Sequence, residues 1–217
     1  MIKVMTDNAA NLPPDLRAQY AITELCLTYT IDGEPVDISK PFDGHAFYEA
    51  MRKGAEVKTS MITPLAAREA MEPVLAQGDD VLYVGLSGGV SGTCVLKAAD
   101  MAQKGADMET IVARANQLIG KMRQHFMVDD LKFLRKGGRL SGAAAFAGTL
   151  LQIKPILQGD SEGISHAAAP AEALHLATVL RQAGCTGEIL SVCHEPVTGA
   201  HVGPGMLALY FYSQTWR

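Results

Sequence analysis

The 217-residue chain lacks an excess of positive charge, a long apolar run and closely spaced cysteines. Its net charge is −4, and its densest basic cluster is the short stretch RKGGR at 135–139. Such a chain has no general attraction for nucleic acid or anionic membranes. Its longest apolar run, AAAFAGTLLQI, is well short of the ~20 residues that span a bilayer. We therefore expect neither a nucleic acid partner nor stable membrane insertion.

The cysteines and the first residues predict the compartment. The opening MIKVMTDNAANLPP becomes polar too early for a secretory signal. Cys26, Cys94, Cys185 and Cys193 form no C-x-x-C pair. This usage is typical of packed thiols in a reducing compartment, and it predicts a cytoplasmic protein rather than a disulfide scaffold or a zinc site.

Several catalytic and cofactor-binding motifs are also absent. The chain has no Gly-Lys-Ser/Thr phosphate loop, no G-x-G-x-x-G, no H-E-x-x-H and no G-x-S-x-G. These absences disfavour a nucleotide enzyme, a zinc hydrolase and a serine hydrolase. We expect no metal and no cofactor.

Predicted strands and helices alternate along the chain. The strands are expected at 1–7, 22–33, 79–87, 125–130, 154–159, 164–168, 187–195 and 206–214. Helices are expected at 13–21, 42–54, 65–78, 93–105, 107–124, 131–139, 140–153 and 171–184. This alternation predicts an α/β protein with mainly parallel sheets, flanking helices and two lobes, 1–104 and 105–217.

The chain is one element short in two places. After the strand at 79–87 two helices follow with no strand between them, although a parallel crossover needs a new strand after its helix. At 159–170, GDSEGISHAAAP, one strand ends and another begins almost at once.

Glycine- and hydroxyl-rich loops are the candidate binding segments. VGLSGGVSGT, at 84–93, places Ser91, Gly92 and Thr93 at the expected start of a helix, where bare amides attract an anion. Without a lysine this loop suits a carboxylate better than a triphosphate. The alternative is a tight turn in which Ser91 caps the helix. KTSMITP, at 58–64, adds Thr59 and Ser60 before another helix, and these hydroxyls are equally able to bond their own backbone.

Three further stretches carry polar groups with two interpretations each. TDN at 6–8 follows the first strand, at a sheet edge where ligands bind, but Asp7 also suits a turn. RKGGR holds Arg139, either a solvated cation or a group facing an anion. TGAHVGPG, at 198–205, is expected to be a rigid loop with His201 exposed or donating to a carboxylate.

Together these stretches resemble the DegV family, bacterial fatty-acid-binding proteins that present an acyl chain to a fatty acid kinase. The matching segments are TDNAANLPPDL, KTSMITP, LSGGVSGT, VDDLKFLRKGGRLSGAAAFAGTLLQIKPIL and TGAHVGPGMLALYF. The resemblance implies a fatty acid in a cleft between two lobes. It assigns the carboxylate to Thr59, Ser91 and His201, and a supporting role in phosphoryl transfer to Arg139.

The chain departs from the family pattern in the two short places, near 94–97 and 163–164, and in TDNAAN, where the family prefers serines. Either the sequence omits two segments, or the protein is a truncated relative whose pocket is open or collapsed. We expect a lipid-binding carrier that is not itself an enzyme. A small-molecule phosphotransferase or hydrolase in the same cleft, and an inert relative without a pocket, are the alternatives.

Overall fold

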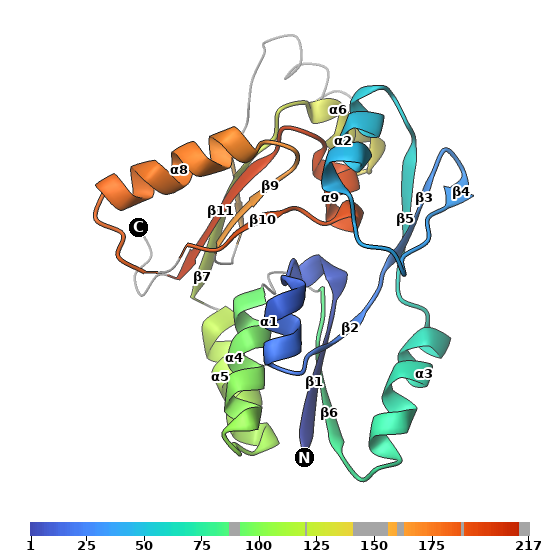
Figure 1. The fold of residues 1–217 in the computed structure, drawn as a ribbon, viewed down its shortest axis with the longest axis vertical. Helices are drawn as coiled ribbons and strands as arrows, with labels where there is room; N and C mark the ends of the chain where they lie inside the picture. The colour runs from blue at the N-terminus through green and yellow to red at the C-terminus, as the bar shows by residue number, and fades with distance from the viewer. Residues whose placement is uncertain (87–91, 120, 141–155, 160–162, 188, 213–217) are drawn as a thin grey trace.

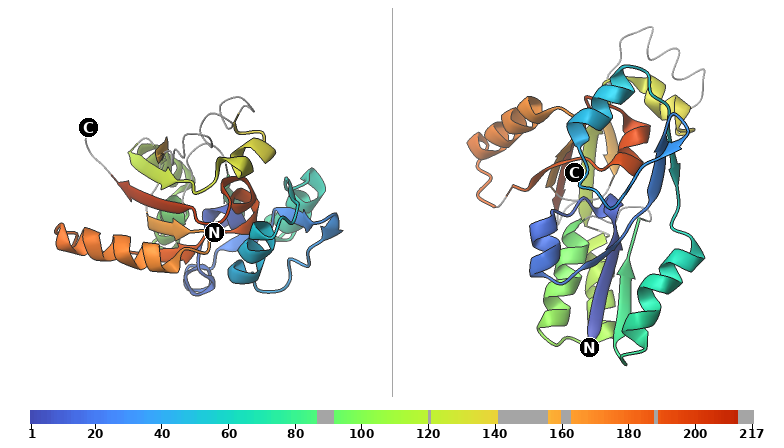
Figure 2. Two further views of the ribbon diagram at one scale, coloured as in Figure 1. Left: turned by 90° about the horizontal axis from the view of Figure 1, so that it is seen from above. Right: turned by 45° about the vertical axis from the view of Figure 1, so that its right-hand side comes forward.

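A computed structural model describes residues 1–86, 92–119, 121–140, 156–159, 163–187 and 189–212. Figures 1 and 2 show its lobes. The described strands form three sheets, ordered β2-β1-β6, β10-β9-β11-β7-β8 and β4-β3-β5. The strands are β1 (Ile2–Asp7), β2 (Thr23–Leu25), β3 (Thr28–Ile31), β4 (Glu34–Pro35), β5 (Val57–Ser60), β6 (Asp80–Val84), β7 (Met122–Met127), β8 (Ile156–Gly159), β9 (Gly163–His166), β10 (Ser191–Cys193) and β11 (Leu207–Tyr212). The helices are η1 (Asn8–Ala10), α1 (Pro14–Gln19), α2 (Gly44–Arg52), α3 (Pro64–Leu75), α4 (Gly92–Gln103), α5 (Met108–Ile119), α6 (Leu131–Lys136), α8 (Pro170–Gln182) and α9 (Pro196–Val202).

The first lobe is built on the parallel sheet β2-β1-β6. β1 pairs with β6 from Ile2 opposite Asp80 to Thr6 opposite Val84. In Figure 1, α4 and α5 lie on one side of these strands and α3 on the other. The apolar face of β1 and β6 packs against α4 and α5 in one core, which includes Val4, Val84, Val95, Ala98 and Ile111.

The second lobe combines the five-stranded mixed sheet with the small antiparallel sheet β4-β3-β5. α2 and α9 lie between these sheets, and α8 lies along β9 (Figure 1). Its core includes Tyr29, Phe47, Tyr48, Phe133 and Met206. Segments from both ends of the chain therefore share one core.

The hydrophobic cores do not follow the expected boundary at 104/105. α5, from beyond residue 104, packs on α4 in the first core, whereas β3 and α2 contribute to the second. The two cores therefore do not correspond to residues 1–104 and 105–217, and the division of the chain into these two lobes stays a prediction.

The α/β architecture is confirmed, but the predicted pairing and one predicted strand need correction. Parallel pairing holds throughout the sheet of β1 and between β9 and β10, whereas the remaining described pairs are antiparallel. The strand expected at 22–33 is two strands in different sheets. The side chain of Asn8 accepts from the N–H of Leu27 and donates to its C=O, so these groups are unavailable to a continuous ladder. The helix expected at 140–153 lies almost entirely outside the described residues.

Candidate functional site

Thr59 lies on a strand and not on the loop that the sequence predicted. Val57–Ser60 form β5, which pairs antiparallel with β3 and places Thr59 opposite Tyr29. The burial alternates along β5, with Thr59 half-buried and Ser60 exposed. Because successive side chains of a strand point to opposite faces, Thr59 and Ser60 do not share one site.

His201 lies on a helix, which corrects the first part of the loop expected at 198–205, whereas residues 203–205 do form a turn. Pro196–Val202 form α9, with Glu195 as N-cap and Pro196 in its first turn. Gly199 is buried in this helix. The position requires glycine because a Cβ there would lie 2.1 Å from the hydroxyl of Tyr48. Gly199 thus makes room for a neighbouring side chain, while Gly203 and Gly205, both at positive φ, lie in the turn after the helix.

Thr59 and His201, 142 positions apart, meet in the structure. The hydroxyl of Thr59 lies 3.3 Å from Nε2 of His201. β5 and α9 are in direct contact, so the pair is set by the packing of two elements. Both side chains are half-buried, which leaves part of each open to a further partner.

The two glycines of RKGGR bring a cation to this pair. A Cβ on Gly137 would lie 2.3 Å from Nδ1 of His201, so only glycine permits the approach. Gly138 has φ +73°, a left-handed conformation that ends α6 and that glycine adopts without strain. Arg139 follows, exposed, and donates from Nη1 to the Gly137 carbonyl at 2.5 Å.

The imidazole of His201 is kept neutral by its surroundings. Burial, and then the positive charge of Arg139, lower the pKa of His201 below its usual value. A neutral imidazole donates through one nitrogen and accepts through the other. The site therefore offers one hydroxyl, one neutral imidazole and a nearby guanidinium, a set that suits a single anionic oxygen group.

Gly92 and Thr93, two of the remaining predicted ligand residues, belong to the start of α4. Ser91 lies outside the described residues, and Thr93 is in the first turn of α4. Gly92 begins this helix, and a Cβ there would lie 2.6 Å from Leu12 and 2.8 Å from the carbonyl of Ala10. Gly92 thus allows α4 to start against the turn that follows β1.

Asp7 has a structural role at the end of β1. Its buried carboxylate accepts from the N–H of Ala9, from the hydroxyl of Tyr83 at 2.7 Å and from the N–H of Leu86 at 2.6 Å. These bonds fix the loop after β6 against the loop after β1. The turn interpretation of TDN therefore holds for Asp7.

A buried polar chain beside α9 was missed by the sequence analysis. His194 and Glu195 are both buried, and they connect to Ser165, Thr198 and Tyr210 through side-chain hydrogen bonds. Glu195 followed by Pro196 was the available signal, because an acceptor before a first-turn proline predicts a helix start.

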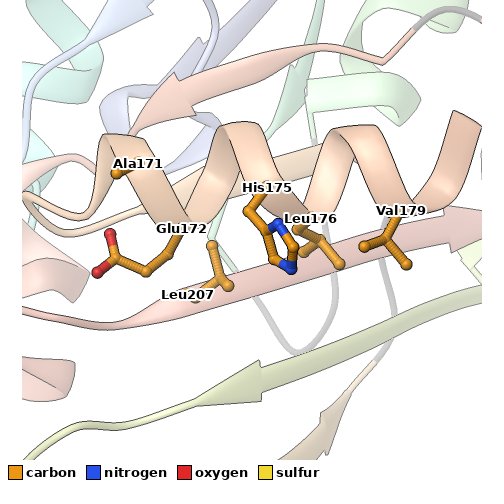
Figure 3. Close-up of a pocket in the computed structure, with 6 residues that line it drawn as sticks. All are labelled: Ala171, Glu172, His175, Leu176, Val179 and Leu207. Carbon is orange, nitrogen blue, oxygen red and sulfur yellow. The ribbon is translucent and has the colours of Figure 1, made fainter.

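An open hollow lies along α8, apart from Thr59 and His201. It measures about 600 Å³ and is bordered by α8 and β11 (Figure 3). Ala171, Glu172, His175, Leu176, Val179 and Leu207 line it. None of these residues was predicted to bind the ligand.

The described residues also bear on the membrane-spanning and metal-binding classes of protein. No helix among them is both long enough and apolar enough to cross a bilayer. In the same part of the chain, no three His, Cys, Asp or Glu side chains gather as a metal site requires.

Fold and site define a two-lobed α/β protein whose polar site is built from neutral side chains beside an arginine. The model of one family, described as "uncharacterised protein, DegV family", matches residues 1–94 and 92–163. Protein DegV of Bacillus subtilis is 32% identical over 195 positions, which cover 75% of this chain and 69% of that protein. The chain belongs to the DegV family.

Solved structures show the same fold. A DegV family protein from Thermus thermophilus, described by its fatty acid binding, superposes with a TM-score of 0.85 at 22% identity, covering 98% of this chain and 99% of its own. The fatty-acid-binding DegV of Bacillus subtilis gives 0.78 at 25% identity with the same coverage. A stearic-acid-binding protein from Eubacterium ventriosum gives 0.83 at 15% identity, covering 97% of each chain.

The chain is shorter than its full-length relatives. A DegV domain-containing protein of Clostridium perfringens aligns over 283 positions, 26% identical, which cover 97% of that protein and 98% of this chain, or about 213 residues. The alignment thus holds about seventy positions, 283 less 213, without a residue here. The two pieces of the family match meet at residues 92–94, near the first place where we expect a segment to be missing.

Proposed function

We propose that this protein binds a long-chain fatty acid and presents its carboxylate to a separate fatty acid kinase, which forms the acyl phosphate. The observation that carries the proposal is the 3.3 Å contact between Thr59 and His201 beside Arg139. Three segments far apart in the sequence converge there. The fatty-acid-binding members of the family support the ligand class.

The physical chemistry of a fatty acid suits such a site. Each buried methylene contributes about 0.8 kcal/mol, so a chain of about fourteen contributes roughly 11 kcal/mol before ordering costs. The carboxylate needs hydrogen bond donors to offset its desolvation, and a hydroxyl with a neutral imidazole supplies them. We place the head group against the Thr59–His201 pair, with Ser91, Gly92 and Thr93 completing its contacts.

Arg139 is assigned to the transfer step and not to the lipid. It is exposed beside His201, so an incoming phosphoryl group approaches it from solvent. A guanidinium binds phosphate oxygens in a bidentate manner, which suits this role. The carrier itself performs no chemistry in this proposal. We also propose a location in the bacterial cytoplasm, supported by the four free cysteines.

Native mass spectrometry tests the proposal. Protein purified from a bacterial host is expected to retain a mass of fatty acid size, and delipidated protein is expected to regain one from oleate. The double variant Thr59→Val/His201→Gln is expected to lose it. Thr28→Val, at an exposed threonine of the neighbouring strand β3, is the matched control. Protein that stays empty after incubation with oleate would refute the proposal.

A further inference from the structure

The N-terminal end of α9 is tied to the first lobe by Glu195. The Glu195 carboxylate accepts from the N–H of Val197 at 2.6 Å, from the N–H of Thr198 at 2.7 Å and from the Thr198 hydroxyl. Its own N–H donates to the side-chain oxygen of Asn11 at 2.7 Å. Asn11 follows β1, so this one residue caps the helix of His201 and links it to the other lobe.

A chain of hydrogen bonds runs from this cap into the five-stranded sheet. Thr198 Oγ1 lies 2.6 Å from Nε2 of His194, and Nδ1 of His194 lies 3.0 Å from the Ser165 hydroxyl. The Ser165 hydroxyl in turn lies 2.9 Å from the Tyr210 hydroxyl. Three elements, β11, β9 and α9, are thereby joined through polar groups in a buried region.

An ionised Glu195 fixes the direction of every proton in this chain. A carboxylate only accepts, so Thr198 donates to it and must accept from Nε2–H of His194. Nδ1 of His194 then carries no proton and accepts from Ser165, which accepts from Tyr210. Burial lowers the pKa of His194 to about 4, in agreement with the neutral imidazole that this order requires.

Among the titratable groups of this hydrogen-bonded chain, Glu195 is the one whose pKa lies near neutral pH. Burial, and to a smaller extent the charge of Asp7 at the end of β1, raise the pKa of Glu195 to about 7, although the hydrogen bonds from Thr198 and Val197 act to lower it. Tyr29 of β3 and Tyr48 of α2 also face it, and burial raises the pKa of both phenols. Burial likewise raises the pKa of Cys193, next to Tyr48, and His166 lies beside His194.

The position of His201 depends on how α9 is held. α9 has only seven residues, so its backbone is ordered by its anchors more than by its own hydrogen bonds. Tyr48 holds the middle of the helix, where it contacts Gly199 and donates to the carbonyl of His194 at 2.9 Å. Protonation of Glu195 would convert the charge-assisted bonds that its carboxylate accepts from Val197 and Thr198 into weaker neutral ones, and so would loosen the cap of α9.

We propose that Glu195 is a positioning residue for the carboxylate site: its ionised form orders α9 and so directs His201 toward Thr59. The choice of a fatty acid as the ligand rests on the proposed function, whereas the effect of Glu195 on α9 and His201 does not. It predicts that fatty acid binding depends on the charge at position 195, and that a neutral residue of the same size does not replace it.

Titration of delipidated protein with oleate at pH 8 and pH 6 tests the dependence. Glu195→Gln is expected to bind roughly tenfold more weakly than the wild type at pH 8, the loss that follows from one charge-assisted hydrogen bond. At pH 6, where the wild-type carboxyl is itself protonated, the two proteins are expected to differ much less. Thr198→Val is expected to weaken binding as well, whereas Thr198→Ser, which keeps the hydroxyl, is the matched control.

Nitrogen NMR of the ligand-free protein separates this inference from the proposed function. With ¹⁵N-labelled histidine, His194 is expected as the Nε2–H tautomer at pH 8. His201 is expected to show a second inflection near the pKa of Glu195, which Glu195→Gln abolishes. An unchanged His201 titration in the variant would overturn the inference, whatever happens with oleate. Absence of oleate binding by the wild type with these NMR changes present would overturn the proposed ligand alone.

Discussion

Thr59 and His201 are neutral groups, and this decides which head group they suit. A carboxylate carries one negative charge over two oxygens, and a hydroxyl and an imidazole N–H are sufficient to bond one of them. A polyphosphate would need more cations than Arg139, the one whose charge acts on His201 among the described residues. At this scale the residues favour a fatty acid over a nucleotide.

Removal of the Thr59 hydroxyl is expected to weaken oleate binding by about 1–3 kcal/mol, because a carboxylate oxygen would lose a donor in a partly buried site. The substitution is Thr59→Val, which preserves the shape on β5. Isothermal titration of the delipidated protein measures the effect. Thr59→Ser retains the hydroxyl and is expected to bind nearly as the wild type does. Equal affinity of the valine variant would place the head group elsewhere.

Arg139→Ala is expected to leave oleate binding nearly unchanged and to lower the rate of acyl phosphate formation by a bacterial fatty acid kinase. Its guanidinium is exposed and lies beside, not between, the proposed ligand groups. Arg135→Ala, in the same exposed cluster, is the matched control for loss of charge. Equal turnover by the Arg139 variant would remove this residue from the transfer step.

The prediction of elements from the sequence succeeded where a strong pattern determined the element. The strand β6 and the helix α3 were expected and are confirmed, whereas the helix expected at 107–124 ends at Ile119 and residues 122–124 belong to β7. The sequence predicts a loop where β5 forms, because the four residues VKTS carry little apolar character. They form a strand by pairing with β3, and they stay partly exposed. Short edge elements of this kind depend on tertiary contacts.

α9 was misread for a different physical reason. Its sequence PVTGAHV contains a proline, a glycine and β-branched residues, which lower helix propensity. The helix forms because Glu195 caps it and because Tyr48 and Phe133 pack against Gly199 and Gly203. Thr59 and His201 could thus be named as candidates from the sequence, whereas their meeting depends on packing between distant segments.

Gly199→Ala tests the close packing of α9. The new methyl group would lie 2.1 Å from the Tyr48 hydroxyl, which is fully buried and bonded to the His194 carbonyl. We expect a loss of about 1–3 kcal/mol in the free energy of unfolding, although alanine favours a helix. Urea denaturation measures the change. Gly187→Ala, where the methyl group would meet nothing within 4 Å, is the control. Equal stability of both variants would contradict the packing described for α9.

At the scale of the whole molecule, two cores are joined by few polar links. Asn11 bonds Glu195 across the lobes, and Asp7 faces the same carboxyl group. The chain lacks about seventy positions found in its Clostridium perfringens relative, yet it has the family fold, and its Thr59 and His201 are in contact. The shortening therefore does not remove the polar groups on which the proposed function depends.

The stability of the molecule is expected to depend on pH through His194. Its pKa is lowered by burial from 6.5 to about 4, so between these values the unfolded chain binds a proton that the folded chain does not. Stability from this residue is present above pH 6.5 and is lost as pH falls toward 4, in total roughly 3 kcal/mol. Glu195, with its raised pKa, acts in the opposite direction, because protonation relieves its burial.

Comparison of variants isolates the contribution of His194. Urea denaturation at pH 7 and pH 4 is expected to show a smaller loss for His194→Asn than for the wild type. His45→Asn, at an exposed histidine, is expected to follow the wild type. If His194→Asn lost as much unfolding free energy between pH 7 and pH 4 as the wild type does, another group would control stability in acid.

The position of the fatty acid head group is the most direct test of the account, and a crystal structure of the oleate complex would show it. The account predicts carboxylate oxygens within hydrogen-bonding distance of Thr59 Oγ1 and His201 Nε2, with the acyl chain leading into the protein. Oleate with its head group away from both side chains, for example in the hollow along α8, would contradict it.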